Sequence, residues 1–153
     1  MTPEQRLAAA EAFWRDDQSD IQLQHADAIV TLARRMKFRP KSVQALPVER
    51  RAKLLAQATD VSDAVATRAL IAYHFTAKRD LMGAFLDALG IPHEHGQIQE
   101  ESVPPPSADR LKAAVSTLRS SFPATDVDLY LRTLSTVDGD TWAELDTVLG
   151  DAP

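Results

Sequence analysis

The stretch LMGAFLDALGIP, residues 81–92, decides the fold class. Its large apolar residues recur at intervals of three and four, which is the spacing of one face of an α-helix. They are Leu81, Met82, Phe85, Leu86 and Leu89. Gly90 then supplies the left-handed backbone that ends a helix, and Pro92 prevents the helix from continuing. Leu86 and Ile91 have the spacing of the apolar pair in a Schellman ending, so the stretch predicts a helix that stops at Gly90.

The same spacing continues on both sides of this stretch. Apolar periods and capping residues predict helices within the segments 2–15, 19–36, 47–55, 62–89, 107–122, 125–134 and 142–150. Ser19 or Asp20 and Thr125 are the expected N-caps of two of them. Lys41 to Ala45 is expected to be a short turn. No run of alternating β-branched residues indicates a strand. The sequence therefore predicts an all-α fold, an irregular orthogonal bundle of about seven helices.

The segment 62–89 leaves one alternative open. Its apolar period is continuous enough for one kinked helix, but Thr76 has the side chain of an N-cap and favours two helices with a break near that residue.

The length of 153 residues indicates one domain, residues 1–153, that can bury a sizeable core without disulfides or metals. Within it, residues 1–96 form the main helical part. Residues 97–106 form a Pro-rich internal loop with three consecutive prolines, 104–106, which favour an extended course. Residues 107–150 carry the C-terminal helices, which are too short a piece to trust alone and are expected to pack on the first part.

Composition and motifs exclude several classes of protein. The chain has no cysteine, so thiolate metal sites and cysteine nucleophiles are excluded. No phosphate-binding loop, dinucleotide fingerprint or nucleophile elbow is present. We therefore expect no cofactor and no catalytic residues. The first 17 residues contain acids and no apolar run, unlike a secretory signal. The sequence also lacks a run of roughly 18 apolar residues, which is the length that a membrane span needs. A cytoplasmic protein without a membrane partner is expected.

The one candidate polar site is His93-Glu94-His95, directly after the helix stop. Two imidazoles in a turn can converge on a cation, but zinc requires three or four ligands. His74 is the remaining candidate, and it follows Leu70 and Ile71 at helical spacing, which is typical of a core histidine with a hydrogen-bond partner. We expect His93 and His95 to be polar loop residues that bind no metal. A small metal- or ligand-binding protein that uses this loop remains an alternative function.

Charge is distributed unevenly along the chain. Eight cations and one acid, Glu49, give residues 34–53 a charge of +7, which leaves −12 for the remainder of a chain whose net charge is −5. The cations are Arg34, Arg35, Lys37, Arg39, Lys41, Arg50, Arg51 and Lys53. They are solvated, paired with the acidic remainder, or contacts for an anionic partner.

The leading functional expectation is a non-catalytic protein-interaction or adaptor module, with a protein partner or self-association. A nucleic-acid-associated regulator is the second alternative. A nucleic-acid partner is disfavoured because Phe38 is the only aromatic residue within the segment 34–53, and single-strand binding uses stacked aromatic side chains.

Overall fold

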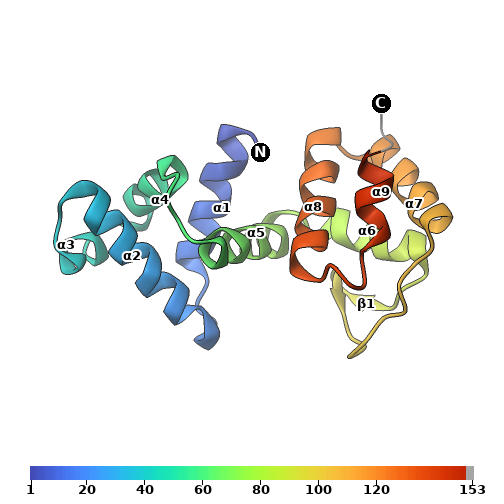
Figure 1. Cartoon of the computed structure of the whole chain (residues 1–153), viewed down its shortest axis with the longest axis horizontal. Helices are drawn as coiled ribbons and strands as arrows, with labels where there is room; N and C mark the ends of the chain where they lie inside the picture. Colours follow the sequence, from blue (N-terminus) through green and yellow to red (C-terminus); the bar gives the residue numbers. More distant parts are fainter. Residues whose placement is uncertain (151–153) are drawn as a thin grey trace. The chain divides into compact units, whose positions relative to one another are not determined.

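The computed structural model describes residues 1–150, which form nine α-helices, a short 3-10 helix and one two-stranded hairpin (Figure 1). The elements are α1 (Pro3–Arg15), η1 (Ser19–Ile21), α2 (Gln22–Met36), α3 (Pro40–Gln44), α4 (Val48–Gln57), α5 (Asp63–Ala77), α6 (Arg79–Leu89), β1 (His93–Glu94), β2 (Gln97–Ile98), α7 (Ala108–Ser121), α8 (Ala124–Val137) and α9 (Glu144–Gly150). The all-α prediction is confirmed.

The described chain has more helices than the expected seven, for two reasons. Residues Lys41 to Ala45, expected to be a turn, belong mostly to helix α3, in which Pro40 occupies the first turn and Arg39 before it is extended, at φ −76° and ψ 146°. The segment 62–89 is two helices, because the backbone leaves the helical region at Lys78, at φ −130° and ψ 27°.

Thr76 is not the N-cap that the sequence suggested. It lies within α5, and its hydroxyl donates to the carbonyl of Ala72 at 2.7 Å and approaches that of Tyr73 at 3.2 Å. A threonine near a helix end can satisfy its hydroxyl inside the helix instead of capping the next one. The expected caps Ser19 or Asp20 and Thr125 are also wrong, because α2 and α8 begin without a side-chain cap.

Other local predictions are confirmed. Thr2 and Gln5 exchange the two hydrogen bonds of a capping box, at 3.1 and 2.9 Å. At the end of α6, Gly90 has φ +68°, its N–H donates to the carbonyl of Asp87 at 3.0 Å, and the N–H of Ile91 donates to that of Leu86 at 2.9 Å. These two bonds define the Schellman ending that residues 81–92 predicted.

The chain divides into two compact units, Met1–Thr76 and the part that begins at Ala77. The division falls at the junction of α5 and α6, whereas the sequence placed the end of the main helical part at Gly96. Whether the two units behave as the single domain expected from the length stays a prediction.

In the first unit, α1 packs along α4, and α2 packs on α3 (Figure 1). Phe13 and Leu32 are fully buried, and the edge of the Phe13 ring faces Trp14 with 5.0 Å between centroids. Small side chains of α1, among them Ala9 and Ala10, are also buried. Their size allows the close approach of two helices.

In the second unit, α6 packs on α7, and α7 and α8 both pack on α9. Phe85 is fully buried, with the rings of Tyr130 and Trp142 each 5.6 Å from its centroid. Burial raises the pKa of the Tyr130 phenol far above its ordinary value of 10.0. This aromatic cluster is the centre of the unit's core.

Residues 93–98, expected to be part of a polar loop, form an antiparallel hairpin in which His93 pairs with Ile98 and Glu94 with Gln97. The two residues between the strands, His95 at φ +51° and Gly96 at φ +84°, both have left-handed backbones. Positive φ at both positions is the requirement of a type I′ turn. The Pro-rich loop, predicted to begin at residue 97, therefore begins after Ile98.

Candidate functional site

Helix α2 ends in an unusual way. The N–H of Phe38 donates to the carbonyl of Ala33 at 2.9 Å, and the N–H of Lys37 donates to that of Arg34 at 3.3 Å. This is the hydrogen-bond pattern of a Schellman ending, and it requires a left-handed residue, for which glycine is preferred. Here Lys37 takes that conformation, at φ +56° and ψ 36°. A side chain in this region costs about 1 kcal/mol relative to glycine.

The side chains around this ending are exposed. Phe38 is 47% exposed and Val30, two turns before Lys37 on the same helix, is 45% exposed. Arg34, Lys37, Arg39 and Lys41 are also exposed and make no hydrogen bond or ion pair through their side chains with the described residues. We call this surface the α2–α3 corner: Val30, Arg34, Lys37, Phe38, Arg39 and Lys41. It combines unpaired cations with apolar surface where α2 is followed by the five-residue helix α3, and Figure 1 shows these two helices next to each other in the chain.

The remaining cations of the segment 34–53 have other surroundings. Arg35 lies 3.6 Å from the carboxylate of Asp60, and the Arg51 guanidinium lies 4.8 Å from the centroid of the Trp14 ring, in a cation–π contact. Lys53 lines a surface hollow together with Arg6 of α1. Arg50 is exposed on α4. The structure therefore leaves four of the eight predicted contact residues exposed and without a side-chain partner among the described residues, at the end of α2 and the start of α3, and gives two of the others intramolecular partners.

The single acid of the segment does not neutralise the α2–α3 corner. Glu49 accepts a hydrogen bond from the Arg15 guanidinium of α1 at 3.1 Å. Both side chains of this pair are more than half exposed, so it contributes little to folding. The positive charge of the corner stays available to solvent.

His93 is an anchor of the hairpin rather than a residue of a solvated loop. The Gly96 N–H donates to its Nδ1 at 3.1 Å, so in this arrangement the ring hydrogen is on Nε2, which donates to the Asp87 carboxylate of α6 at 2.8 Å. Its side chain is only 15% exposed. The ring also lies against Gly83, where an added Cβ would come within 3.1 Å of it. Nε2 of His93 thus fastens the hairpin to α6, while Nδ1 braces the hairpin turn at Gly96.

A polar hollow of about 340 Å³ lies beside this hairpin, and its lining includes Asp80, Asp87, His93 and His95. Within residues 1–150, no three His, Asp or Glu side chains are grouped closely enough to hold a metal ion. His95 is exposed at the turn. That His93 and His95 bind no metal stays a prediction, and the hollow offers no arrangement that favours the metal-binding alternative.

His74 is in the position that its spacing predicts. It is 2% exposed, and its Nδ1 lies 2.8 Å from the carbonyl of Leu70, one turn earlier in α5. Because a carbonyl only accepts, Nδ1 carries the hydrogen of this bond. His74 belongs to the first unit, and His93 and His95 belong to the second.

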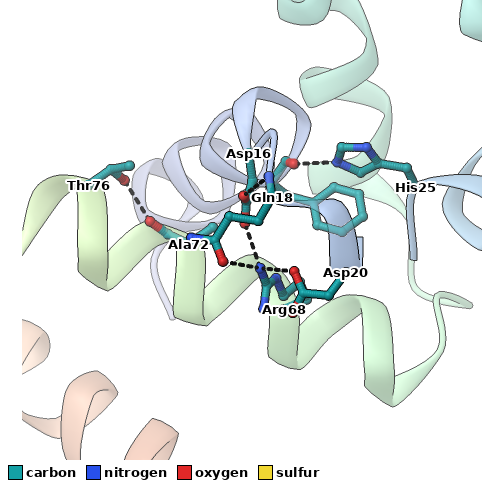
Figure 2. Close-up of polar contacts among 8 residues, drawn as sticks. Asp16, Gln18, Asp20, His25, Arg68, Ala72 and Thr76 are labelled. Carbon is teal, nitrogen blue, oxygen red and sulfur yellow. Dashed lines mark hydrogen bonds and ion pairs between the residues drawn. The ribbon is translucent and has the colours of Figure 1, made fainter. Parts of the chain in front are cut away.

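Two polar contacts in the first unit escaped the sequence analysis. His25 donates through Nε2 to the carbonyl of Phe13 at 2.6 Å, near the end of α1, where carbonyls lack partners within the helix (Figure 2). The His25 ring also lies between 4.8 and 5.3 Å from the rings of Phe13 and Trp14. This histidine closes the C-terminus of α1.

The second contact is a cluster around Arg68, the one cation in the apolar helix α5. Its guanidinium donates to Asp16 and Gln18 at 3.2 Å and to both carboxylate oxygens of Asp20 at 3.2 and 3.3 Å (Figure 2). The Arg68 and Asp16 side chains are 17% and 11% exposed. Two features of the sequence could have indicated this cluster. Arg68 is the one arginine within the apolar period of residues 63–77, and Asp16 and Asp20 are two acids four residues apart at the junction of two predicted helices. The cluster fastens α5 to the segment between α1 and α2.

Comparisons with protein-family models, with curated proteins and with solved structures find no significant match for this chain. In the part of the chain that the structure describes, no helix is both long enough and apolar enough to cross a membrane.

Proposed function

We propose that this chain is a non-catalytic protein-interaction module and that its α2–α3 corner binds an acidic segment of a partner protein. One observation carries the proposal. At consecutive positions the chain keeps a lysine in a left-handed conformation and a half-exposed phenylalanine, among cations without intramolecular partners. Each choice is unfavourable for folding, and conformational strain of this kind concentrates at functional positions.

The composition of the corner favours a protein partner. Arginine and large apolar side chains are enriched in protein interfaces. Arg34, Phe38 and Arg39 provide both types within six residues. A carboxylate-rich segment with apolar side chains complements these cations and the exposed faces of Val30 and Phe38.

A nucleic-acid partner is less well supported. The whole chain carries a net charge of −5, which works against a long polyanion. Arg35 and Arg51, which would extend a cationic surface, are already in contact with Asp60 and Trp14. The corner by itself offers four unpaired cations, enough for a short acidic segment.

The test measures binding of a fluorescent peptide of about twelve residues, in which Glu and Asp alternate with Leu and Phe, by anisotropy at low salt. We expect the double variant Arg34→Glu/Lys41→Glu to weaken binding about tenfold or more, since two attractions become repulsions. The matched control, Arg50→Glu/Arg132→Glu, reverses two exposed cations that lie outside the corner and make no side-chain hydrogen bond or ion pair with the described residues, and it should leave the affinity within about twofold.

Equal effects of the two double variants would reduce the peptide binding to net charge and refute the proposed surface. A duplex DNA of similar charge, added as competitor, provides the second arm. Displacement of the peptide by DNA at equal charge concentration would move the nucleic-acid alternative into first place. The variant Phe38→Ser tests the apolar contribution to binding. It should lower the affinity for the peptide and leave the affinity for DNA unchanged.

A further inference from the structure

Two adjoining hollows in the first unit have contrasting linings. The inner one has a volume of about 360 Å³ between α1, α4 and α5. Its walls are mainly aliphatic, with Leu55, Val65 and Leu70 among them, and Arg6 and Thr59 are its polar lining residues. The outer one, of about 680 Å³, shares Met1, Arg6 and Ala56 with it and adds Lys53. An apolar hollow thus opens beside a surface hollow that contains two cations.

The small side chains of the inner hollow leave space that the helices do not fill. Val65 is 1% exposed and Leu55 7% exposed, so the floor of the hollow belongs to the core of the unit. Ala66, on the next turn of α5, is exposed and lies at its rim. A volume of this size, with aliphatic walls and few polar groups, is typical of a site for a small ligand.

The charges beside this hollow all have one sign. Arg6 and Lys53 are exposed, and neither makes a hydrogen bond or ion pair through its side chain with the described residues. No Asp or Glu lines either hollow, although acids outnumber bases in the chain by 22 to 17. Two unpaired cations beside low-dielectric walls attract an anion.

We propose that these hollows form one binding site for a small aliphatic carboxylate, with its tail in the inner hollow and its carboxylate beside Arg6 and Lys53. The tail removes apolar wall from water, and the two cations select the charge of the head group. This site uses none of the residues of the α2–α3 corner, so it is independent of the function proposed above.

Three probes with the same tail test the proposal: sodium octanoate, octan-1-ol and octylammonium chloride, each titrated into the full chain by calorimetry. We expect octanoate to bind at least about fivefold more tightly than octylammonium, since two partly exposed ion pairs replace two repulsions. The double variant Arg6→Gln/Lys53→Gln should lower the octanoate affinity about fivefold and leave that of octanol unchanged. The control Arg132→Gln removes an exposed cation of α8 and should change neither.

Ala66→Leu places a larger side chain at the rim of the inner hollow, at an exposed helical position where leucine is well tolerated. It should lower the affinity of octanoate and octanol alike, while circular dichroism shows an unchanged fold. Equal affinities of octanoate and octylammonium would overturn the proposal. So would the absence of saturable octanoate binding, or binding that neither the Arg6→Gln/Lys53→Gln variant nor Ala66→Leu alters.

Discussion

At the scale of single residues, two helix endings with the same hydrogen bonds differ in one side chain. Gly90 ends α6 at φ +68° and Lys37 ends α2 at φ +56°. The first could be predicted, because glycine followed by Ile91 and Pro92 is typical of a helix stop. The second could not, because lysine does not favour the left-handed region and nothing in the sequence marks it. Lys37, on which the proposed function depends, is therefore a residue whose conformation could not be predicted from its local propensity.

Substitutions at the two residues of the hairpin turn, His95 and Gly96, should change the free energy of unfolding in opposite directions. Asn tolerates a left-handed backbone better than histidine, so His95→Asn should raise the free energy of unfolding by about 0.5 kcal/mol. Gly96→Ala should lower it by more than about 1 kcal/mol, because φ is +84° and the new Cβ would lie 2.7 Å from the Cβ of Met82. Urea melts of both variants provide the measurement. A destabilised His95→Asn would show that the imidazole contributes more than the turn.

Asp138 gives a prediction for pH. Its carboxylate accepts hydrogen bonds from the Thr141 side chain and from the Thr141 N–H, at 3.2 Å for the latter, which lowers its pKa below the ordinary value of 3.8. A lowered pKa stabilises the fold above the unfolded pKa, and this stabilisation is lost as pH falls through the folded pKa. Wild type should be more stable than Asp138→Asn at about pH 7, and the two should converge below about pH 4. A difference that stays constant in melts across this range would contradict the assignment.

At the scale of elements, apolar spacing located most of the helices, because a buried face repeats with the helical period. It did not locate α3, which has five residues and a single buried side chain, Val43. Nor did it give the hairpin of residues 93–98, in which His93 contacts Asp87 and Gly83 of α6 across the turn at Gly90. Short elements depend on tertiary contacts, which a local pattern does not contain.

Arg68 tests how α5 is attached to the segment between α1 and α2. Arg68→Met removes four hydrogen bonds and leaves the Asp16 carboxylate, 11% exposed, without its cation. We expect a loss of about 2 kcal/mol in the free energy of unfolding of the first unit. Arg68→Lys should recover only part of it, because an ammonium does not reproduce the guanidinium fork.

The matched control for Arg68 is Arg15→Met, which breaks the exposed pair with Glu49 in the same unit. Its expected effect is within about 0.5 kcal/mol. Equal losses for Arg68→Met and Arg15→Met, read from Trp14 fluorescence in urea, would show that the Arg68 cluster is ordinary surface charge.

At the scale of the whole molecule, the sequence indicated the fold class and the charge asymmetry but not the division between Thr76 and Ala77. It also placed eight cations in one candidate set, of which four belong to the α2–α3 corner. The separation of Arg35 and Arg51 from the corner follows from their contacts with Asp60 and Trp14. Asp60 and Trp14 lie outside the segment 34–53, so these two contacts could not be predicted from the sequence of that segment.

Each unit has its own buried tryptophan, Trp14 at 5% and Trp142 at 2% exposure. The variants Trp142→Phe and Trp14→Phe therefore report the unfolding of the first and second unit separately. Each unit is close to the size at which one core is only marginally stable alone. The single-domain prediction then requires coincident urea midpoints, in agreement with far-UV circular dichroism. Two separated midpoints would show that the units are independent domains.

We propose that the α2–α3 corner is kept for a partner at the expense of stability. Lys37→Gly tests it most directly, because it relieves the left-handed strain and removes one cation of the corner. We expect this variant to gain about 1 kcal/mol in the free energy of unfolding, measured in urea, while its affinity for the acidic peptide falls about threefold. A variant that loses stability, or one that gains stability and binds the peptide as tightly as wild type, would contradict the account.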